Sequence, residues 1–440
     1  MRIPRLGCLG WVMAGILFIA AVGLVGYLWY HSTADIRQVE QEARAIGIPP
    51  TWAEAGVIQA DPATLATCTA LVALADSTRS WTSDHSQDLP RIGEEPPASL
   101  REYHAKISPQ VWDDLSDKIT ALSAKPVVLH AQPQEYYRKS NSYWSELRDL
   151  SRLFTEQLLI VPLTEVPAVV LAASHIAVLV SPQALIDQLV NDSMAQIVVQ
   201  GVTRRLPELR QTPAGNACAQ HLRVLRDTLW NSRAQVWISQ LMMGNELSPG
   251  AFGTVAFPVT YEWEELWGKT QENSKIILQP LAWRAQRADS MRVVVQYAHA
   301  YQMAKDPADL ARQIALVVIP PSLAMQWAAA LDCDSKIENL PLIDRAFLKT
   351  ILSLDVVIAE LAGSALPADY FSPTQAPLKP VIRSGKRIGW YSVDANGADD
   401  GGFRKNDFGI PTDETFGKRH FADELESRVM PPATQVVSSP

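Results

Sequence analysis

Cysteine is scarce in this sequence, with four residues among 440, and no two of them stand in a CxxC pair. The short-range zinc and thiol-redox motifs are therefore absent. Beyond Cys8 the cysteines are Cys68, Cys218 and Cys333, at unrelated spacings; an oxidising compartment could pair two of them and leave one free. HExxH and GxSxG are also absent, which excludes the zinc proteases and serine hydrolases that carry these motifs.

An excess of basic charge is missing as well. The chain has 39 Lys and Arg residues against 47 Asp and Glu, a formal net charge of −8, and no long basic stripe that could neutralise phosphates. A nucleic-acid-binding protein is therefore not expected. Hydrophobic residues make up 47% of the chain, and its length predicts two or three structural units. Proline outnumbers glycine, 30 to 22, which favours segmented helices over one long coiled coil.

A long apolar run near the N-terminus is the most informative segment. Residues 8–30 form 23 consecutive positions without a formal charge, preceded by Arg2 and Arg5. A helix rises about 1.5 Å per residue, so this run is long enough to cross the roughly 30 Å hydrocarbon core of a bilayer. Aromatic residues stand near both of its ends. The sequence predicts a single-pass anchor whose partner is the lipid bilayer, with the N-terminus cytoplasmic and the bulk of the chain extracytoplasmic.

Two alternatives bear on this topology. A cleaved signal peptide could end at Ser32-Thr33-Ala34, although the apolar run is longer than is usual for such a peptide. A second span could lie in residues 158–180, but Glu165, Pro162 and Pro167 fall within it. A carboxylate and two prolines are costly in lipid, so we expect this segment to be a buried helix or helix pair in a soluble core.

The fold class we expect is mainly α, in four parts. Residues 1–33 are the cytoplasmic stub and anchor, 34–365 a multi-helix ectodomain with a seam near 245–260, 366–411 a small β-hairpin module, and 412–440 a disordered tail. Short strands near residues 275–278 or 291–295 remain open. Caps and three- to four-residue apolar spacing predict helices over residues 35–45, 61–75, 109–122, 141–160, 181–205, 217–243, 307–318, 321–331 and 342–361.

The C-terminal module contains a predicted hairpin and an acidic loop. Residues 381–382 and 388–393 read as two strands joined at Ser384-Gly385-Lys386, followed by DANGADDGG over residues 394–402. Calcium takes six to eight oxygen ligands, which closely spaced Asp and Asn side chains in a glycine-rich loop can supply. A hydrated Asx/Gly turn is the other interpretation. The candidate calcium ligands are Asp394, Asn396, Asp399, Asp400 and Asp407.

The same segment carries a resemblance. Trp390-Tyr-Ser-Val-Asp-Ala-Asn-Gly-Ala-Asp-Asp-Gly-Gly402 resembles the YSxGxDGxDDGG ending of single-pass envelope proteins of planctomycete-type bacteria. It is also similar to the C-terminal calcium loop of the major pseudopilin of type II secretion. The lead-in, Pro367-Ala-Asp-Tyr-Phe-Ser-Pro373, is similar to the families' lead-in, with Ser372 in place of their Asp. The resemblance covers residues 366–410 and implies calcium binding; because the N-terminus lacks a prepilin peptidase signature, it does not imply assembly into a pilus.

The leading interpretation is a non-enzymatic envelope protein that acts in interaction or scaffolding, with a link to secretion. No catalytic or cofactor-binding residue is assigned. A membrane-anchored hydrolase with dispersed catalytic residues is one alternative, and Cys218 with His221, one helical turn apart, is its nearest approach to a nucleophile and base. A ligand-binding module that uses the acidic and aromatic residues 261–267 is the other.

Overall fold

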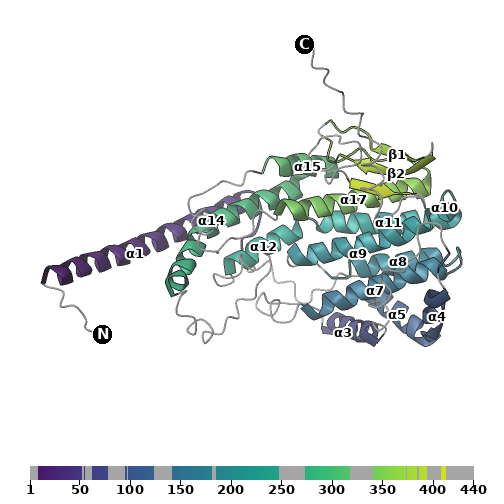
Figure 1. The fold of residues 1–440 in the computed structure, drawn as a ribbon, viewed down its shortest axis with the longest axis horizontal. Helices are drawn as coiled ribbons and strands as arrows, with labels where there is room; N and C mark the ends of the chain where they lie inside the picture. Colours follow the sequence, from purple (N-terminus) through teal and green to yellow (C-terminus); the bar gives the residue numbers. More distant parts are fainter. Residues whose placement is uncertain are drawn as a thin grey trace, which may run out of the picture. The chain divides into compact units, whose positions relative to one another are not determined.

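The computed structural model describes most of the helical chain and part of the C-terminal module. The described residues are 8–51, 54, 62–77, 95–96, 98–122, 141–180, 185–246, 273–317, 340–372, 374–383, 386–393 and 408–412. Within them lie thirteen helices and one three-stranded antiparallel sheet (Figure 1). The predicted mainly α class is confirmed. The helices are α1 (Cys8–Ala45), α3 (Pro62–Ser77), α4 (Ala98–Lys106), α5 (Pro109–Leu122), α7 (Asn141–Ile160), α8 (Val166–Ala177), α9 (Leu185–Arg204), α10 (Leu206–Leu209), α11 (Pro213–Ser232), α12 (Gln235–Glu246), α14 (Asn273–Met303), α15 (Pro307–Ala315) and α17 (Leu340–Ala362).

The chain divides into two compact units. The first unit comprises Met1–Val57, Trp237–His299 and Val317–Leu340. The second unit comprises Ile58–Val236, Ala300–Leu316 and Pro341–Pro440. Each unit is therefore assembled from segments that are distant in the sequence.

Helix α1 of the first unit joins the predicted anchor and the predicted short helix over residues 35–45 into one helix of 38 residues. Ile36, Val39 and Ala43 in its C-terminal half are buried, whereas Phe18 and Ile19 in its N-terminal half are 71% and 72% exposed. Among the described residues, no helix is both long and apolar enough to cross a membrane. The predicted transmembrane span is therefore not confirmed.

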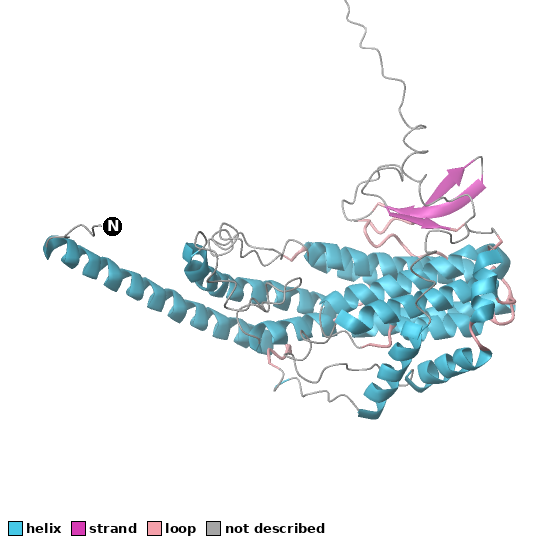
Figure 2. Ribbon diagram, turned by 60° about the horizontal axis from the view of Figure 1, so that its bottom comes forward, coloured by secondary structure: helices cyan, strands magenta, loops and turns pink. Residues whose placement is uncertain are grey.

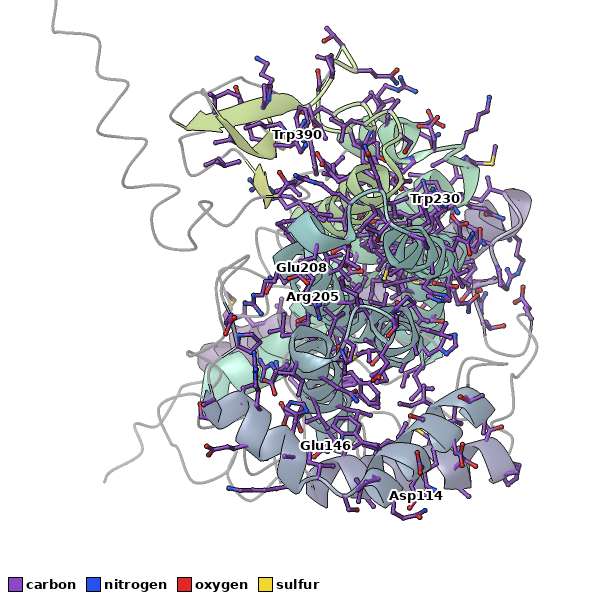
Figure 3. The ribbon with its side chains drawn as sticks, turned by 90° about the vertical axis from the view of Figure 1, so that its right-hand side faces the viewer. Asp114, Glu146, Arg205, Glu208, Trp230 and Trp390 are labelled. Atoms are coloured by element: carbon purple, nitrogen blue, oxygen red, sulfur yellow. The ribbon has the colours of Figure 1, made fainter. Side chains whose placement is uncertain are left out.

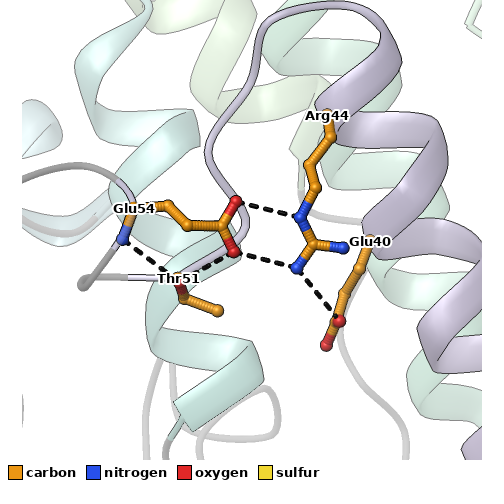
Figure 4. Close-up of polar contacts among 4 residues, drawn as sticks. All are labelled: Glu40, Arg44, Thr51 and Glu54. Carbon is orange, nitrogen blue, oxygen red and sulfur yellow. Dashed lines mark hydrogen bonds and ion pairs between the residues drawn. The ribbon is translucent and has the colours of Figure 1, made fainter.

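A charged cluster fixes the end of α1 (Figure 4). The Arg44 guanidinium donates to both carboxylate oxygens of Glu54, at 2.9 and 2.8 Å, and to Glu40 one turn before it, at 3.4 Å. The hydroxyl of Thr51 donates to the same Glu54 carboxylate at 3.1 Å. The hydrogen bond to Glu54 raises the pKa of Arg44, and the hydrogen bond from Arg44 lowers the pKa of Glu54. The chain beyond Gly47, whose φ is +77°, is thereby tied back to the helix.

The short strands considered near residues 275–278 and 291–295 are wrong, because both segments are helical in α14. Both segments belong to one helix of 31 residues. Val293, Val294 and Val295 are all buried, which is a pattern that a buried strand and a buried helix share. The flanking residues of α14 are rich in Ala, Gln and Arg, which favour a helix. In the first unit, Tyr297 of α14 stacks on Trp237 of α12 with 4.6 Å between ring centroids.

The core of the second unit is formed by α7, α8, α9 and α11, which pack on one another. The apolar face predicted for α7 is confirmed, because its members are all buried: Leu147, Leu150, Leu153, Phe154, Leu158 and Leu159. The apolar segment 158–180 forms the end of α7 and the buried helix α8, as expected for a soluble core. Pro162 and Glu165 lie at the exposed turn between the two helices.

The predicted helix over residues 217–243 is two helices, α11 and α12, and α11 begins earlier than predicted. Thr212 caps α11 by accepting a hydrogen bond from the Gly215 N–H at 3.0 Å, and Pro213 occupies the first turn. Between the helices, the Arg233 guanidinium donates to the Trp230 and Ala304 carbonyls, both at 2.7 Å. It also lies 3.9 Å from the centre of the Trp230 ring. The arginine thus adds a side-chain hydrogen bond at the end of α11, where the Arg233 N–H also donates to the Trp230 carbonyl at 3.3 Å.

The β module of the second unit consists of β1 (Lys379–Arg383), β2 (Lys386–Ser392) and β3 (Phe408–Pro411), in the order β1-β2-β3. Figure 2 shows the sheet on one side of the helices of this unit. The predicted hairpin is confirmed as β1 and β2, which are antiparallel with a register shift between Val381 and Ile382. Strand β3 was not predicted. It pairs with β2 from Ser392, opposite Phe408, to Gly389, opposite Pro411.

Candidate functional site

The predicted calcium ligands Asp394, Asn396, Asp399, Asp400 and Asp407 all lie outside the described residues. Among the residues that are described, no group of three or more His, Cys, Asp or Glu side chains is placed to hold a metal ion. The ligand set therefore stays a prediction. What the structure does describe is the pair of strands on either side of these residues.

The two strands that flank the acidic segment pair with each other. Ser392 at the end of β2 lies opposite Phe408 at the start of β3. Directly opposed residues in an antiparallel ladder have Cα atoms about 4.5–5.5 Å apart. The sheet therefore ends at Ser392 and resumes at Phe408 at neighbouring positions, and the predicted ligands lie between these two residues in the sequence.

Asp369 holds the start of that connection. Its buried carboxylate accepts hydrogen bonds from the Ser392 hydroxyl at 2.6 Å and from the Val393 N–H at 2.8 Å. It also accepts from the Phe371 N–H at 3.0 Å. Three donors converge on this one side chain, so Asp369 fixes the residue that directly precedes Asp394. The sequence presented Asp369 in the lead-in of the resemblance but did not indicate this role.

Glu360 of α17 connects the sheet to the helices. It accepts from Arg387 of β2 at 2.9 Å, from the Trp390 indole N–H at 2.7 Å, and forms an ion pair with Arg210 at 3.0 Å. Trp390 is labelled in Figure 3. The guanidinium carbon of Arg387 lies over its indole ring, 4.5 Å from the ring centroid. Arg210 in turn donates to the Thr412 carbonyl at 3.1 Å, just beyond β3. One carboxylate therefore joins α17, the α10–α11 turn and strand β2.

A second contact between the helices and the lead-in lies nearby on α17. Asp355 forms an ion pair with Arg226 of α11 at 3.2 Å and accepts a short hydrogen bond from the Tyr370 hydroxyl. Burial raises the pKa of Asp355, and burial also raises the pKa of Tyr370. Tyr370 therefore keeps its proton at neutral pH and acts as the donor.

A cavity of about 260 Å³ lies among α5, α8 and α11 of the second unit. Leucine and valine side chains form most of its wall, including Leu122 and Leu171, and Val224 at 57% exposure places its mouth at the surface. The polar side chains in the wall are Ser174 and His175 of α8 and His221 and Thr228 of α11. The structure thus places His175 in the same cavity wall as His221, which the sequence paired with Cys218 instead.

The environment of these residues changes the interpretation of Cys218 with His221. Burial raises the pKa of the Cys218 thiol to about 12, so it remains protonated at neutral pH and is not an activated nucleophile. His221 lines the cavity with His175, and Cys218 does not. Burial lowers the pKa of both imidazoles, and the charge of His221 lowers that of His175 further. Cys68 and Cys218 are both buried and free.

Of the other histidines in the chain, His104 occupies a core position. His104 is buried, stacks on Trp112 at 5.6 Å and lies 3.8 Å from the carboxylate of Glu156. This arrangement is a buried polar contact between α4 and α7. His85, His130 and the acidic-aromatic residues 261–267 lie outside the described residues.

No known protein-family model matches the chain, and no curated protein and no solved structure matches it either.

Proposed function

We propose that this chain is a single-pass membrane-anchored protein of the bacterial envelope that acts in interaction or scaffolding. The observation that carries the proposal is the exposure of large apolar side chains in the N-terminal half of α1. Met13, Ile16, Leu17, Phe18, Ile19 and Val22 are all more than half exposed. Burying such a side chain is worth about 1.5–3 kcal/mol, a gain that water does not provide and a bilayer does.

The charges around this segment support an orientation. Arg2 and Arg5 precede the uncharged residues 8–30, and basic residues near a span are retained on the cytoplasmic side. With that orientation, the whole chain beyond the anchor is extracytoplasmic: the second unit and those parts of the first unit that follow residue 33. The resemblance of residues 366–410 to single-pass envelope proteins supports the same compartment.

Vesicle flotation of the full chain tests the anchor. The wild-type chain should float with phosphatidylcholine–phosphatidylglycerol vesicles in high salt, which removes purely electrostatic binding. The double substitution Leu17→Arg and Phe18→Asp places two charges in the apolar segment and should leave the chain in the soluble fraction. Val224→Arg is the matched control, because Val224 is an exposed apolar residue of α11, and it should float as the wild type does. Equal flotation of the charged double variant contradicts the proposal.

The β module supports a second candidate function, calcium binding by residues 394–407. The supporting observation is the pairing of Ser392 with Phe408, together with the hydrogen bonds from Ser392 and Val393 to Asp369. Both ends of the connection are thereby held in place, which reduces the entropy lost when the loop closes around an ion. Asp394, Asn396, Asp399, Asp400 and Asp407 supply the oxygen ligands in this proposal.

Calcium-dependent thermal melting of the full chain tests this second function. A ligand at 100 times its Kd stabilises the folded state by about 2.7 kcal/mol, so the melting temperature should rise with calcium and not with magnesium. Asp399→Ala should abolish the calcium-dependent rise. Asp113→Ala, which removes an exposed carboxylate from α5, should leave it unchanged. A melting temperature that does not change in millimolar calcium rules out the site.

A further inference from the structure

The cavity among α5, α8 and α11 has the size of a small-molecule site. Its volume is about 260 Å³. An apolar cavity of about 150 Å³ is large enough to hold benzene. The additional space and the two imidazoles leave room for a ring or a short alkyl chain together with one polar group. This cavity is separate from the β module and from α1, so it adds to the proposed function and does not depend on it.

The wall of the cavity has an apolar part and a polar part. Leu122 of α5 and Leu171 of α8 provide apolar surface, whereas His175 and His221 come from two different helices. Ser174 is buried, and its hydroxyl has no hydrogen-bond partner among the described residues. A buried hydroxyl without a partner is uncommon in native proteins and calls for an explanation such as a bound ligand.

The protonation states around the cavity restrict the ligand. Among the described residues that line it, the imidazoles of α8 and α11 are the titratable groups, and α5 contributes Leu122. Burial lowers the pKa of both imidazoles, so at neutral pH each is uncharged and offers one donor and one acceptor nitrogen. Cys218, one turn before His221, remains a neutral thiol. A carboxylate that enters this wall gains a counter-charge when an imidazole takes up a proton.

We propose that this cavity binds a small monocarboxylic acid with an apolar body, of the size of benzoate or hexanoate, whose carboxyl group lies between His175 and His221. The complex holds one proton more than the free protein and the free carboxylate together, and that proton is shared between the carboxyl group and an imidazole. Leu122, Leu171 and the neighbouring valines surround the apolar body.

Calorimetric titration of the full chain in detergent with benzoate and hexanoate tests the proposal. Saturable binding in the millimolar range or tighter is expected, with benzamide, the neutral analogue, at least about tenfold weaker. Binding should tighten as the pH falls from about 8 to about 6, because the complex takes up a proton. His175→Gln and His221→Gln should each weaken benzoate binding at least about tenfold. His299→Gln on α14, which does not line the cavity, is the matched control and should bind as the wild type does.

A second measurement does not depend on the folding of any variant. In the wild-type chain, imidazole NMR titrations should show that saturating benzoate raises the pKa of His175 or His221. Failure to bind either acid, equal binding of benzamide, or unchanged affinity in both histidine variants overturns the proposal. Histidine-dependent binding of Zn²⁺ without binding of either acid also overturns it, in favour of a metal.

Discussion

The backbone N–H of Val393 donates to the Asp369 carboxylate at 2.8 Å, one residue before the first predicted calcium ligand. Asp369 belongs to the turn-rich lead-in that follows α17, whereas Val393 directly follows β2. The contact therefore ties the lead-in to the point at which the acidic segment leaves the sheet. This hydrogen bond therefore stabilises the β module and positions the start of the proposed ion site.

The substitution Asp369→Asn should selectively destabilise the end of β2, where Ser392 and Val393 bind the Asp369 side chain. The amide retains one acceptor oxygen but turns a donor toward either the Val393 N–H or the Ser392 hydroxyl, and an unsatisfied buried donor costs about 1–3 kcal/mol. Hydrogen exchange of residues 386–393 should accelerate by at least about tenfold, while exchange in α7 stays unchanged. Calcium stabilisation should weaken in the same variant. Unchanged exchange in β2 would show that the Asp369 contact does not hold the strand.

Glu360→Gln should detach the sheet from the helices more than an ordinary surface substitution does. The Glu360 side chain is 8% exposed and forms ion pairs with Arg210 and Arg387, whereas Glu208 is 48% exposed and pairs with Arg205. We expect a loss of about 1–2 kcal/mol for Glu360→Gln, since both arginines are partly exposed, and less than about 1 kcal/mol for Glu208→Gln. Denaturant unfolding followed by circular dichroism measures the difference. Equal losses would place Glu360 among ordinary surface pairs.

Gly201 marks a close approach between α9 and α7. A Cβ atom at this position would lie 2.5 Å from the Cγ2 of Thr155. Gly201→Ala should therefore destabilise the chain by about 1–3 kcal/mol, despite the higher helix propensity of alanine. Thr155→Ser removes the clashing methyl group, so the double variant should recover most of the loss. Thermal unfolding of the two single variants and the double variant checks this, and additive losses would argue against a steric cause.

Asp192 should make the second unit sensitive to pH. Burial raises its pKa to about 8, and the Gln188 side chain donates to its carboxyl group at 2.8 Å. A raised pKa means that the folded state holds a proton that the unfolded state releases above about pH 4. This contribution to stability is fully present below about pH 4 and is lost as the pH rises toward about 8.

Asp192→Asn removes that contribution to the pH dependence. The variant should gain at least about 1 kcal/mol relative to the wild type between pH 5 and pH 7.5, because one proton corresponds to about 1.4 kcal/mol per pH unit. Melting curves at the two pH values measure this gain. Asp113→Asn on the exposed face of α5 is the control. Parallel pH profiles for the wild type and Asp192→Asn contradict the assignment.

Apolar spacing and capping residues predicted those elements whose signals lie within a single helix or hairpin. The apolar spacing in α7 identified its buried face, and the Asp306-Pro307 cap located the start of α15. Strand β3 was missed because it is four residues long and is stabilised by pairing with β2 across an undescribed connection. The start of α11 was missed although Thr212-Pro213 is a recognisable cap.

The candidate sites likewise contain features that the sequence predicted and features that depend on the fold. The acidic segment was identified from spacing alone, but the role of Asp369 depends on a fold that places the lead-in beside β2. His175 and His221 meet because α8 packs on α11, and neither helix carries a sequence signal for the other. Sequence reasoning paired His221 with Cys218 on the same helix instead. Contacts between distant helices are set by packing, which a single sequence does not display.

The most direct measurement for the proposed function is the side of the membrane on which the chain beyond the anchor lies. Full-length chain with a C-terminal epitope is produced in a Gram-negative host, and protease is added to intact spheroplasts. We expect carbonate-resistant membrane association and complete loss of the epitope, with a cytoplasmic marker protein intact. An epitope that stays protected until the spheroplasts are lysed, or a chain that carbonate releases from the membrane, would contradict the anchored, extracytoplasmic arrangement.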